Sequence, residues 1–441
     1  MSRVCWRPHV PRRSTDLVHY GVLAALFVVA LAVPFVFGTL SILGSMTVFL
    51  LLLSWSISWR QGHMGLDEQA KDRSAWLFWG MAGLIAILIP LIAGTPFFLA
   101  TMVAFFIYLT WNTMWGLVLG TAGLQSFATV AVAGVAGYAA AYLTIDITKS
   151  NAAAAGAECS GDRLLGVPVL DWWVAMPVAG LVGLVVGFVI SLPAIRLKGI
   201  YFALLTIGLI ELCRAYVGQD KCNLGGAQGL FGASSFLPSD MMGSLEGYRY
   251  AYAAALLMVV VALLIYWKVN YGRLGLLLRT ARESEPVAEV LGVNVVRART
   301  WVFLISSSML GVAGGFYVAY YKSISPNFFS FSTVLLLFAM IMIGGINSPR
   351  GILIGTMLLT FVDRRFIDVS PPEARFIFIG LVLLVVTLLV TGGLVSVPDQ
   401  LRRRLEGRGR QGSGPTSDPP EEQAAIEQEA HMPPGSRPGT G

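Results

Sequence analysis

The chain has 441 residues and a formal net charge of +6, and 56% of it is hydrophobic while only 13% is charged. Soluble domains carry about 25% charged residues, so this composition excludes an ordinary soluble protein. Four cysteines and four histidines, with no Cys-x-x-Cys pair, are too few for a disulfide scaffold and argue against a metal site. The sequence contains no Walker A motif, so we expect neither ATP binding by that route nor any other cofactor.

Apolar stretches long enough to cross a bilayer recur from the N-terminus to residue 391. A spanning helix needs about 20 mostly apolar residues. Because several junctions are tight and some stretches could be half-helices, we predict an all-α, polytopic transmembrane bundle of about 10–12 spans. In chain order the predicted spans are 17–37, 40–58, 76–94, 97–119, 123–144, 173–193, 199–217, 250–269, 300–321, 331–346, 351–366 and 375–391.

Basic residues concentrate in alternate connections between these spans, and segments 268–299 and 392–441 are the richest. Cytoplasmic loops of membrane proteins carry an excess of Lys and Arg, so we predict that both termini are cytoplasmic. This orientation explains the positive net charge without a nucleic-acid partner. Arg402, Arg403 and Arg404 would then lie where anionic headgroups of the membrane lipid can be met.

Two longer loops, 145–172 and 218–249, fall on the outer side in this orientation. Cys159 lies in the first loop and Cys222 in the second. In an oxidising compartment the two cysteines could form a disulfide, and the alternative is two unpaired thiols.

Polar side chains inside the predicted spans are few. Glu211 and Arg214 are three residues apart on one face of span 199–217, and we expect them to form a structural ion pair, because unpaired charges at membrane depth are costly. Asn112 is a single amide inside span 97–119, where we expect it to make a helix–helix hydrogen bond.

The most polar connection is 270–299, and its pattern is not that of a plain loop. Apolar residues recur with helical spacing, charged residues of both signs lie between them, and Pro286 suits the first turn of a second short helix. An amphipathic helix here could dock a partner protein or lie on the membrane interface, and the periodicity favours neither.

Segment 279–293 closely resembles the cytoplasmic loop of branched-chain amino acid ABC transporter permeases of the LivM type. Other segments of the chain resemble motifs of that family in the same order. These segments are Leu197–Thr206, Glu211–Arg214, Gly225–Leu230, Ser325–Ser332 and the glycines from Gly344 to Gly355. The resemblance covers roughly residues 105–390.

The resemblance implies a non-enzymatic permease subunit of an importer in the bacterial cytoplasmic (inner) membrane. A separate ABC ATPase would drive it, an external substrate-binding protein would deliver the substrate, and a sister permease or second copy would complete the path. The family implies that loop 273–293 docks the ATPase. The predicted coupling residues are Arg279, Arg282, Glu283, Glu285, Ala288, Leu291 and Gly292.

On this reading the chain divides into three parts. Residues 1–96 would be N-terminal membrane helices, and 97–397 the permease core with the coupling loop at 270–299. The tail 398–441 is rich in Gly, Pro, Gln and Glu and is predicted to be disordered.

For the substrate path we single out Gln125, Ser126 and Thr129, because glycines around them permit a broken helix with exposed backbone groups. Gly344 and Gly345 join them through the resemblance. The alternative is that these small residues only allow helices to pack closely.

Segment Ser126–Val132 departs from the family's pattern, which leaves the substrate open between branched-chain or related amino acids and urea or short amides. A stand-alone channel or secondary transporter is the rival class. Proton coupling would need ionisable residues deep in the bundle, and the sequence has almost none.

Overall fold

The computed structural model describes the central part of the chain. The described residues are 95–145, 170–194, 197, 199–221, 223–237, 243–283, 288, 294–346 and 348–365, with isolated positions at 79, 80, 82, 83, 86, 90, 380, 381 and 384. The chain divides into two compact units, Met1–Pro398 and Asp399–Gly441, and every described residue belongs to the first. Spans 17–37 and 40–58, most of 76–94 and 375–391, both loop cysteines and the predicted tail lie outside the described residues.

The described part is helical, which confirms the predicted fold class. In chain order the elements are α4 (Pro96–Gly116), the π-helical turn η2 (Leu117–Thr121), α5 (Thr129–Thr144), α7 (Trp172–Ala194), α8 (Ile200–Gln219), β1 (Leu230–Phe231), α9 (Leu245–Tyr271), α10 (Arg273–Glu283), α12 (Val295–Tyr321), β2 (Ser323–Ile324), the 3-10 turn η4 (Pro326–Phe329), α13 (Phe331–Gly344) and α14 (Pro349–Arg365).

Five of these described helices are long and apolar enough to cross a membrane: α4 with η2, α7, α8, α9 and α12. Helices α5 and α13 are apolar but shorter.

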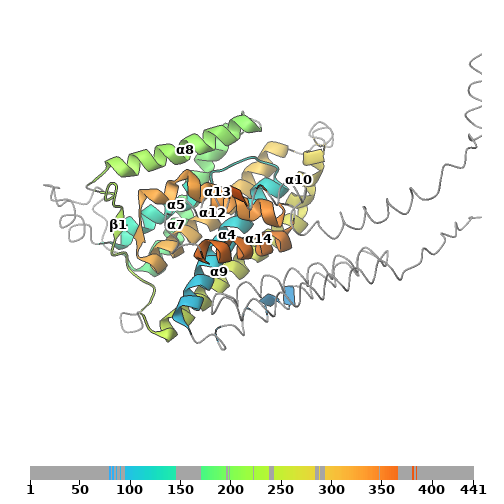
Figure 1. Ribbon diagram of the computed structural model, residues 1–441. Coiled ribbons are helices and arrows are strands. Elements are labelled where there is room, and N and C mark those ends of the chain that lie inside the picture. Colours follow the sequence, from blue (N-terminus) through green and yellow to red (C-terminus); the bar gives the residue numbers. More distant parts are fainter. Residues whose placement is uncertain are drawn as a thin grey trace, which may run out of the picture. The chain divides into compact units, whose positions relative to one another are not determined.

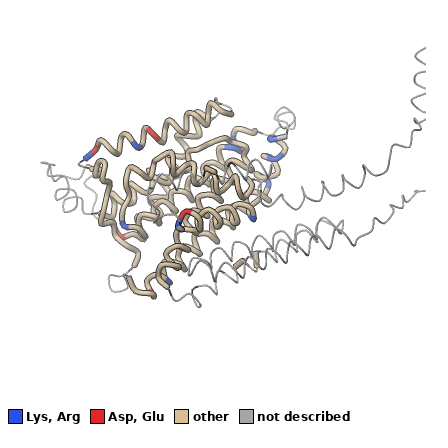
Figure 2. The backbone as a smooth tube through the Cα atoms, in the orientation of Figure 1, with Lys and Arg blue, Asp and Glu red and all other residues tan. Residues whose placement is uncertain are grey.

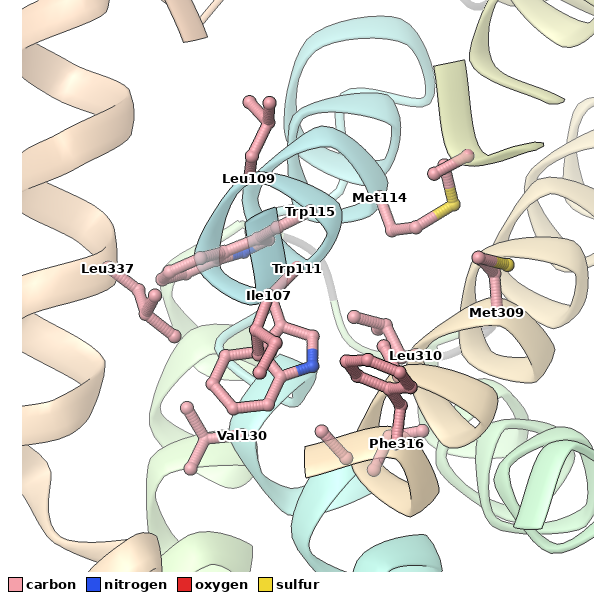
Figure 3. Close-up of a cluster of buried hydrophobic side chains, with 14 of the residues drawn as sticks. Ile107, Leu109, Trp111, Met114, Trp115, Val130, Met309, Leu310, Phe316 and Leu337 are labelled. Atoms are coloured by element: carbon pink, nitrogen blue, oxygen red, sulfur yellow. The ribbon is translucent and has the colours of Figure 1, made fainter. Parts of the chain in front are cut away.

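Helix α4 lies at the centre of the bundle (Figure 1). It is apolar all round, and 83% of its most apolar window is buried, as expected for a helix surrounded by other helices. Its Trp111 and Trp115 are among the largest fully buried side chains, and they pack beside Val130 of α5, Leu310 of α12 and Leu337 of α13 (Figure 3). Asn112 donates a hydrogen bond of 3.0 Å to the hydroxyl of Thr356 on α14, which confirms the predicted helix–helix contact.

Helices α7 and α12 approach each other through small residues. A Cβ atom added to Gly183 would lie 2.8 Å from the Cα atom of Gly311, so a larger residue could not occupy this crossing. Lipid tails are as apolar as the helices, so leaving the lipid gives a helix no hydrophobic stabilisation. Membrane helices therefore associate through close van der Waals packing, which small residues permit.

The predicted span 123–144 is wrong in its first residues, because α5 begins only at Thr129. Helix α4 ends in η2, where Ala122 N donates to Leu117 O, and Gly123 then takes a φ of +68° that turns the chain out of the helix. The Trp115 indole donates to the carbonyl of Ser126 over 2.6 Å and holds the non-helical segment against α4. Within this segment Ser126 and Ala128 are buried, whereas Gly123 and Gln125 are exposed.

The two ends of the bundle differ. At one end β1 and β2 form a short antiparallel ladder with Leu230 opposite Ile324, so the predicted loop 218–249 is partly ordered by a distant segment. Helix α10 lies at the other end (Figure 1). Helix α4 runs between these ends.

Candidate functional site

Helix α10 is the amphipathic helix predicted within 270–299. Leu278 and Ala281 are buried, while Leu276, Arg279 and Arg282 are exposed. Its buried face continues into a small apolar cluster in which Ala281 packs with Ala288 and Val295. This places Ala288 of the predicted coupling set beside α10 and the start of α12.

Two arginines from different elements reach the end of the broken helix α4–η2. Arg282 of α10 donates from Nη1 to the carbonyl oxygen of Gly120 over 2.7 Å. Arg299 of α12 donates from Nε to the carbonyl oxygen of Ala122 over 3.3 Å. The last carbonyls of a helix lack intrahelical donors and carry partial negative charge, so guanidinium groups stabilise this end.

The end of α9 completes this contact. Asn270 accepts a hydrogen bond from the hydroxyl of Thr121 at 3.0 Å. Arg279 donates to the carbonyl of Asn270 at 3.3 Å, and its guanidinium lies 5.6 Å from the ring centre of Tyr271. We call this meeting of η2, α9, α10 and α12 the α10 junction. Its residues are Gly120, Thr121, Ala122, Asn270, Arg279, Arg282 and Arg299.

The remaining predicted coupling residues are described only in part. Glu283 ends α10, and only its backbone is described. Glu285, Leu291 and Gly292 lie outside the described residues. Arg299, Gly120 and Asn270 were not predicted as coupling residues. The available signal for Arg299 was the pair of basic residues just before span 300–321.

Two predicted path residues, Gln125 and Ser126, lie between the α10 junction and α5, and the third, Thr129, begins α5. Gln125 is exposed, whereas Ser126 and Thr129 are buried. Phe127 N donates to the hydroxyl of Thr206 on α8 at 3.0 Å, so this segment is tied to α8 as well as to α4.

Gly344 and Gly345 lie where α13 turns into α14. A Cβ atom on Gly344 would collide with the carbonyl of Gly351, and Gly345 has a φ of +107°. Close packing and turn formation are thus two local reasons for glycine at these positions, and the place of both residues in the substrate path stays a prediction.

A cavity of about 460 Å³ opens near the β1–β2 ladder, at the end of the bundle opposite α10. Its lining combines aromatic rings with hydroxyl and amide groups. The lining residues are Tyr108, Trp111, Ala227, Gln228, Phe231, Tyr317, Ser323, Ile324, Ser325, Asn327, Phe328 and Thr333.

Three rings form one wall of this cavity. The centroids of Trp111 and Tyr317 are 5.7 Å apart, those of Trp111 and Phe328 are 5.4 Å apart, and Phe328 meets Tyr317 at 5.1 Å. No Asp, Glu, Lys or Arg is among the described residues of the lining. A pocket of this size, with apolar rings and a few polar groups, suits a small neutral or zwitterionic molecule.

Sequence reasoning did not assign this cavity to the path. The signal was present in the two motif segments Gly225–Leu230 and Ser325–Ser332, which the ladder brings together across the chain. Helix α4 with η2 connects the two regions, since Trp111 of α4 lines the cavity and Gly120 of η2 belongs to the α10 junction.

The predicted pair on α8 has its side chains close together. Arg214 Nη1 lies 3.6 Å from Glu211 Oε2, and the two side chains are 44% and 48% exposed. Among the described residues, no group of three or more His, Cys, Asp or Glu side chains could hold a metal ion.

Comparison with known proteins gives similar sequences but no similar solved structure. The chain is 27% identical over 254 residues to the high-affinity branched-chain amino acid transport system permease protein LivM of Salmonella typhimurium, covering 53% of this chain and 60% of that protein. It is 26% identical over 209 residues to a probable LivM permease of Methanocaldococcus jannaschii, covering 46% and 58%. It is 27% identical over 142 residues to LivH of Escherichia coli, covering 32% and 45%. No solved structure matches the chain.

The chain thus spans about 60% of the length of the first of these relatives. A family model described as the permease component of branched-chain amino acid transport systems matches residues 97–387, which hold nearly all described elements. This is a family of multi-pass membrane permeases, not of enzymes. The chain belongs to the permease-component family of branched-chain amino acid transport systems.

Proposed function

We propose that this chain is the membrane-spanning permease subunit of an ABC importer for branched-chain or related small amino acids, energised by a separate ATPase. The observation that carries the proposal is the hydrogen bond from Arg282 on α10 to Gly120 at the end of α4. This bond links α10, on which a partner would dock, directly to the end of the central helix. We place the protein in the bacterial cytoplasmic (inner) membrane, with both termini inside.

In this proposal α10 is the surface on which the ATPase presses. Movement of α10 displaces Arg282, and the α10 junction carries that displacement to η2, where the helix is already broken. In the proposed mechanism the central helix bends at this π-helical turn. Such turns are frequent at functional sites. Helix α4 then shifts and moves Trp111, which is part of the cavity wall. This movement opens the path alternately to the two sides of the membrane.

We infer the substrate class from the residues that line the cavity and from the similar proteins. Aromatic rings suit a compact apolar side chain, and hydroxyl and amide groups suit the polar end of an amino acid. The similar proteins named LivM and LivH are branched-chain amino acid permeases. The similarity to these permeases suggests two partners, which are an external substrate-binding protein and a second permease chain.

The test is to purify the tagged full-length chain from its own membrane. We expect ABC ATPase subunits to co-purify with it, and Arg282→Glu to lose them. Arg297→Glu is the matched control, because Arg297 is an exposed arginine on the first turn of α12. In liposomes the complex should concentrate leucine only with ATP. Concentrative uptake by the lone chain, without any ATPase, would overturn the proposal.

A further inference from the structure

The end of α14 holds a buried charge. Of the Asp, Glu, Lys and Arg side chains that the structure describes, only Asp363 is buried, at 1% exposure. In Figure 2 red and blue are sparse, and tan covers most of the length of the described helices. Burying a charge costs free energy, and a charged residue inside a membrane protein marks a functional site by default. Packing alone therefore does not explain Asp363.

The next residue, Arg364, is held by a tyrosine of α12. Its Nη2 donates a hydrogen bond of 3.0 Å to the hydroxyl oxygen of Tyr321. A guanidinium has donors only, so the Tyr321 hydroxyl accepts here and keeps its own hydrogen for another acceptor. The Nε of Arg364 is buried and has no hydrogen-bond partner among the described residues. Arg364 thus leaves the Tyr321 hydroxyl as a donor, and its own bonding is not completed within the described part of the chain.

These two charges lie behind tyrosines of the cavity wall. The ring centroids of Tyr321 and Tyr317 are 4.6 Å apart, and Tyr317 lines the cavity. Tyr108 also lines the cavity, and both Asp363 and Arg364 interact electrostatically with it without lining the cavity themselves. In a low-dielectric interior, charges act across such a layer more strongly than they would in water. The wall at Tyr108 and Tyr317 is therefore polarised from behind.

We propose that Asp363 and Arg364 make the cavity select a zwitterionic α-amino acid over a neutral amide of similar size. The two opposite charges cancel, so together they favour no net charge on the bound molecule. They match a molecule whose ammonium and carboxylate groups are themselves neighbours, because Arg364 favours the carboxylate and Asp363 the ammonium group. A neutral amide would need only the hydroxyl and amide groups that line the cavity.

Both are positioning residues, since they act through the tyrosine side chains and not by touching the substrate. This inference rests on the proposed function, in which the cavity belongs to the substrate path. A purely structural role for the two charges predicts that their variants misfold or leave selectivity unchanged. A positioning role predicts a folded complex with altered selectivity.

Equilibrium binding to the purified complex tests the selectivity. Tritiated leucine is bound in detergent without ATP and without an external binding protein. The competitor is isocaproamide, which has the side chain of leucine but neither of its charges. We expect the wild-type complex to prefer leucine at least about tenfold. Arg364→Gln and Asp363→Asn should each lower the preference to about threefold or less by weakening leucine binding alone.

The matched control is Arg249→Gln. Arg249 is an exposed arginine near the start of α9, and it is not among the residues that line the cavity. The control removes the same charge and should keep the full preference for leucine. An equal loss in this control would show that any nearby arginine has the effect, and it would overturn the inference.

Two further variants test whether Arg364 acts through Tyr321. Arg364→Lys keeps the charge and a donor, and the single bond to Tyr321 does not need the guanidinium fork, so this variant should retain most of the preference. Tyr321→Phe keeps the ring but removes the hydroxyl. It should lower the preference as Arg364→Gln does, and combining the two should add little. Full additivity would contradict a route through the Tyr321 hydroxyl.

Size-exclusion chromatography checks that each variant complex is folded. A folded Arg364→Gln complex with unchanged preference would overturn the inference, as would a wild-type complex that binds no leucine or does not distinguish it from isocaproamide. If Arg364→Gln does not fold, Arg364→Lys and Tyr321→Phe decide. No readout uses ATP, so the ATPase can co-purify while this inference fails, and the importer proposal then stands for a different substrate.

Discussion

Arg282 of α10 donates a hydrogen bond from Nη1 to the carbonyl oxygen of Gly120, 162 residues earlier, over 2.7 Å. The acceptor lies in a π-helical turn that ends the central helix α4. This contact joins the helix that we assign to ATPase docking to the helix whose Trp111 lines the cavity.

Arg282→Gln should uncouple transport without unfolding the chain. The side chain is exposed, and the substitution removes a charge-assisted bond of about 1.5–3 kcal/mol to the π-helical turn at the end of α4. We expect leucine uptake per ATP hydrolysed to fall about tenfold or more, with Arg282→Lys losing less because it keeps the charge. Proteoliposome transport with parallel ATPase assays measures the ratio. An unchanged ratio in Arg282→Gln would exclude this bond from coupling.

Arg299→Gln should act on the same carbonyl end as Arg282→Gln. Because both arginines bind one short segment, the two substitutions should be non-additive in a double-mutant cycle of the coupling ratio. Arg297→Gln, on the same turn of α12 but exposed, is the control. Independent, additive effects would show that the two arginines hold separate elements.

Thr356→Val should destabilise the bundle by about 1–2 kcal/mol, because it removes the hydroxyl that accepts the buried Asn112 amide. Thr360→Val is the matched control: its hydroxyl donates only to the carbonyl of Thr356 within α14. We expect that variant to change stability by less than about 0.5 kcal/mol. Unfolding of the chain in mixed detergent micelles gives both values, and equal effects would contradict an interhelical role for Asn112.

Gly344→Ala should prevent correct folding, since the added methyl group collides with the Gly351 carbonyl of the adjacent helix. Backbone atoms of packed helices cannot yield as a flexible side chain can. Gly208→Ala on α8 is the control, because a Cβ there meets nothing within 4 Å. Size-exclusion yield in detergent distinguishes them. A well-folded Gly344→Ala protein would show that α13 and α14 separate more readily than their contact indicates.

Asn327→Leu should weaken substrate binding while leaving ATPase docking intact. Asn327 is an exposed amide on the cavity wall, and leucine keeps its approximate size but removes its hydrogen-bonding groups. We expect KM for leucine uptake to rise about tenfold, equivalent to about 1.4 kcal/mol. Gln219→Leu removes an exposed amide at the end of α8 outside the cavity and should leave KM unchanged. An unaltered KM in Asn327→Leu would remove the cavity from the substrate path.

Much of the fold was predictable because it follows from local pattern. Apolar runs placed α7, α8, α9 and α12 to within a few residues, and helical periodicity marked α10. The prediction failed at residues 123–128, where Gly123 turns the chain out of the helix and the polar residues Gln125 and Ser126 follow among apolar neighbours. Hydropathy averaged over a whole span does not locate the residue at which a helix begins.

The sequence predicted some residues of the candidate site and missed others. Arg279 and Arg282 were selected by resemblance, but their acceptors at Asn270 and Gly120 were not. Gly344 was assigned to the path through the resemblance, and the structure adds that it lies in a close contact between α13 and α14. Trp111 and Tyr317 line the cavity. In the sequence they cannot be distinguished from core residues, because no local pattern identifies an aromatic residue that borders a cavity.

The amino-acid sequence by itself determined that this protein is a helical membrane protein of the permease class, with an amphipathic helical segment within 270–299, because hydropathy, periodicity and motif order are carried by neighbouring residues. Only the tertiary structure decided that Arg282 meets Gly120, and that segments 223–237 and 322–333 close a cavity around Trp111. Those contacts join residues roughly a hundred or more positions apart, and they exist only once helix packing has fixed which faces meet.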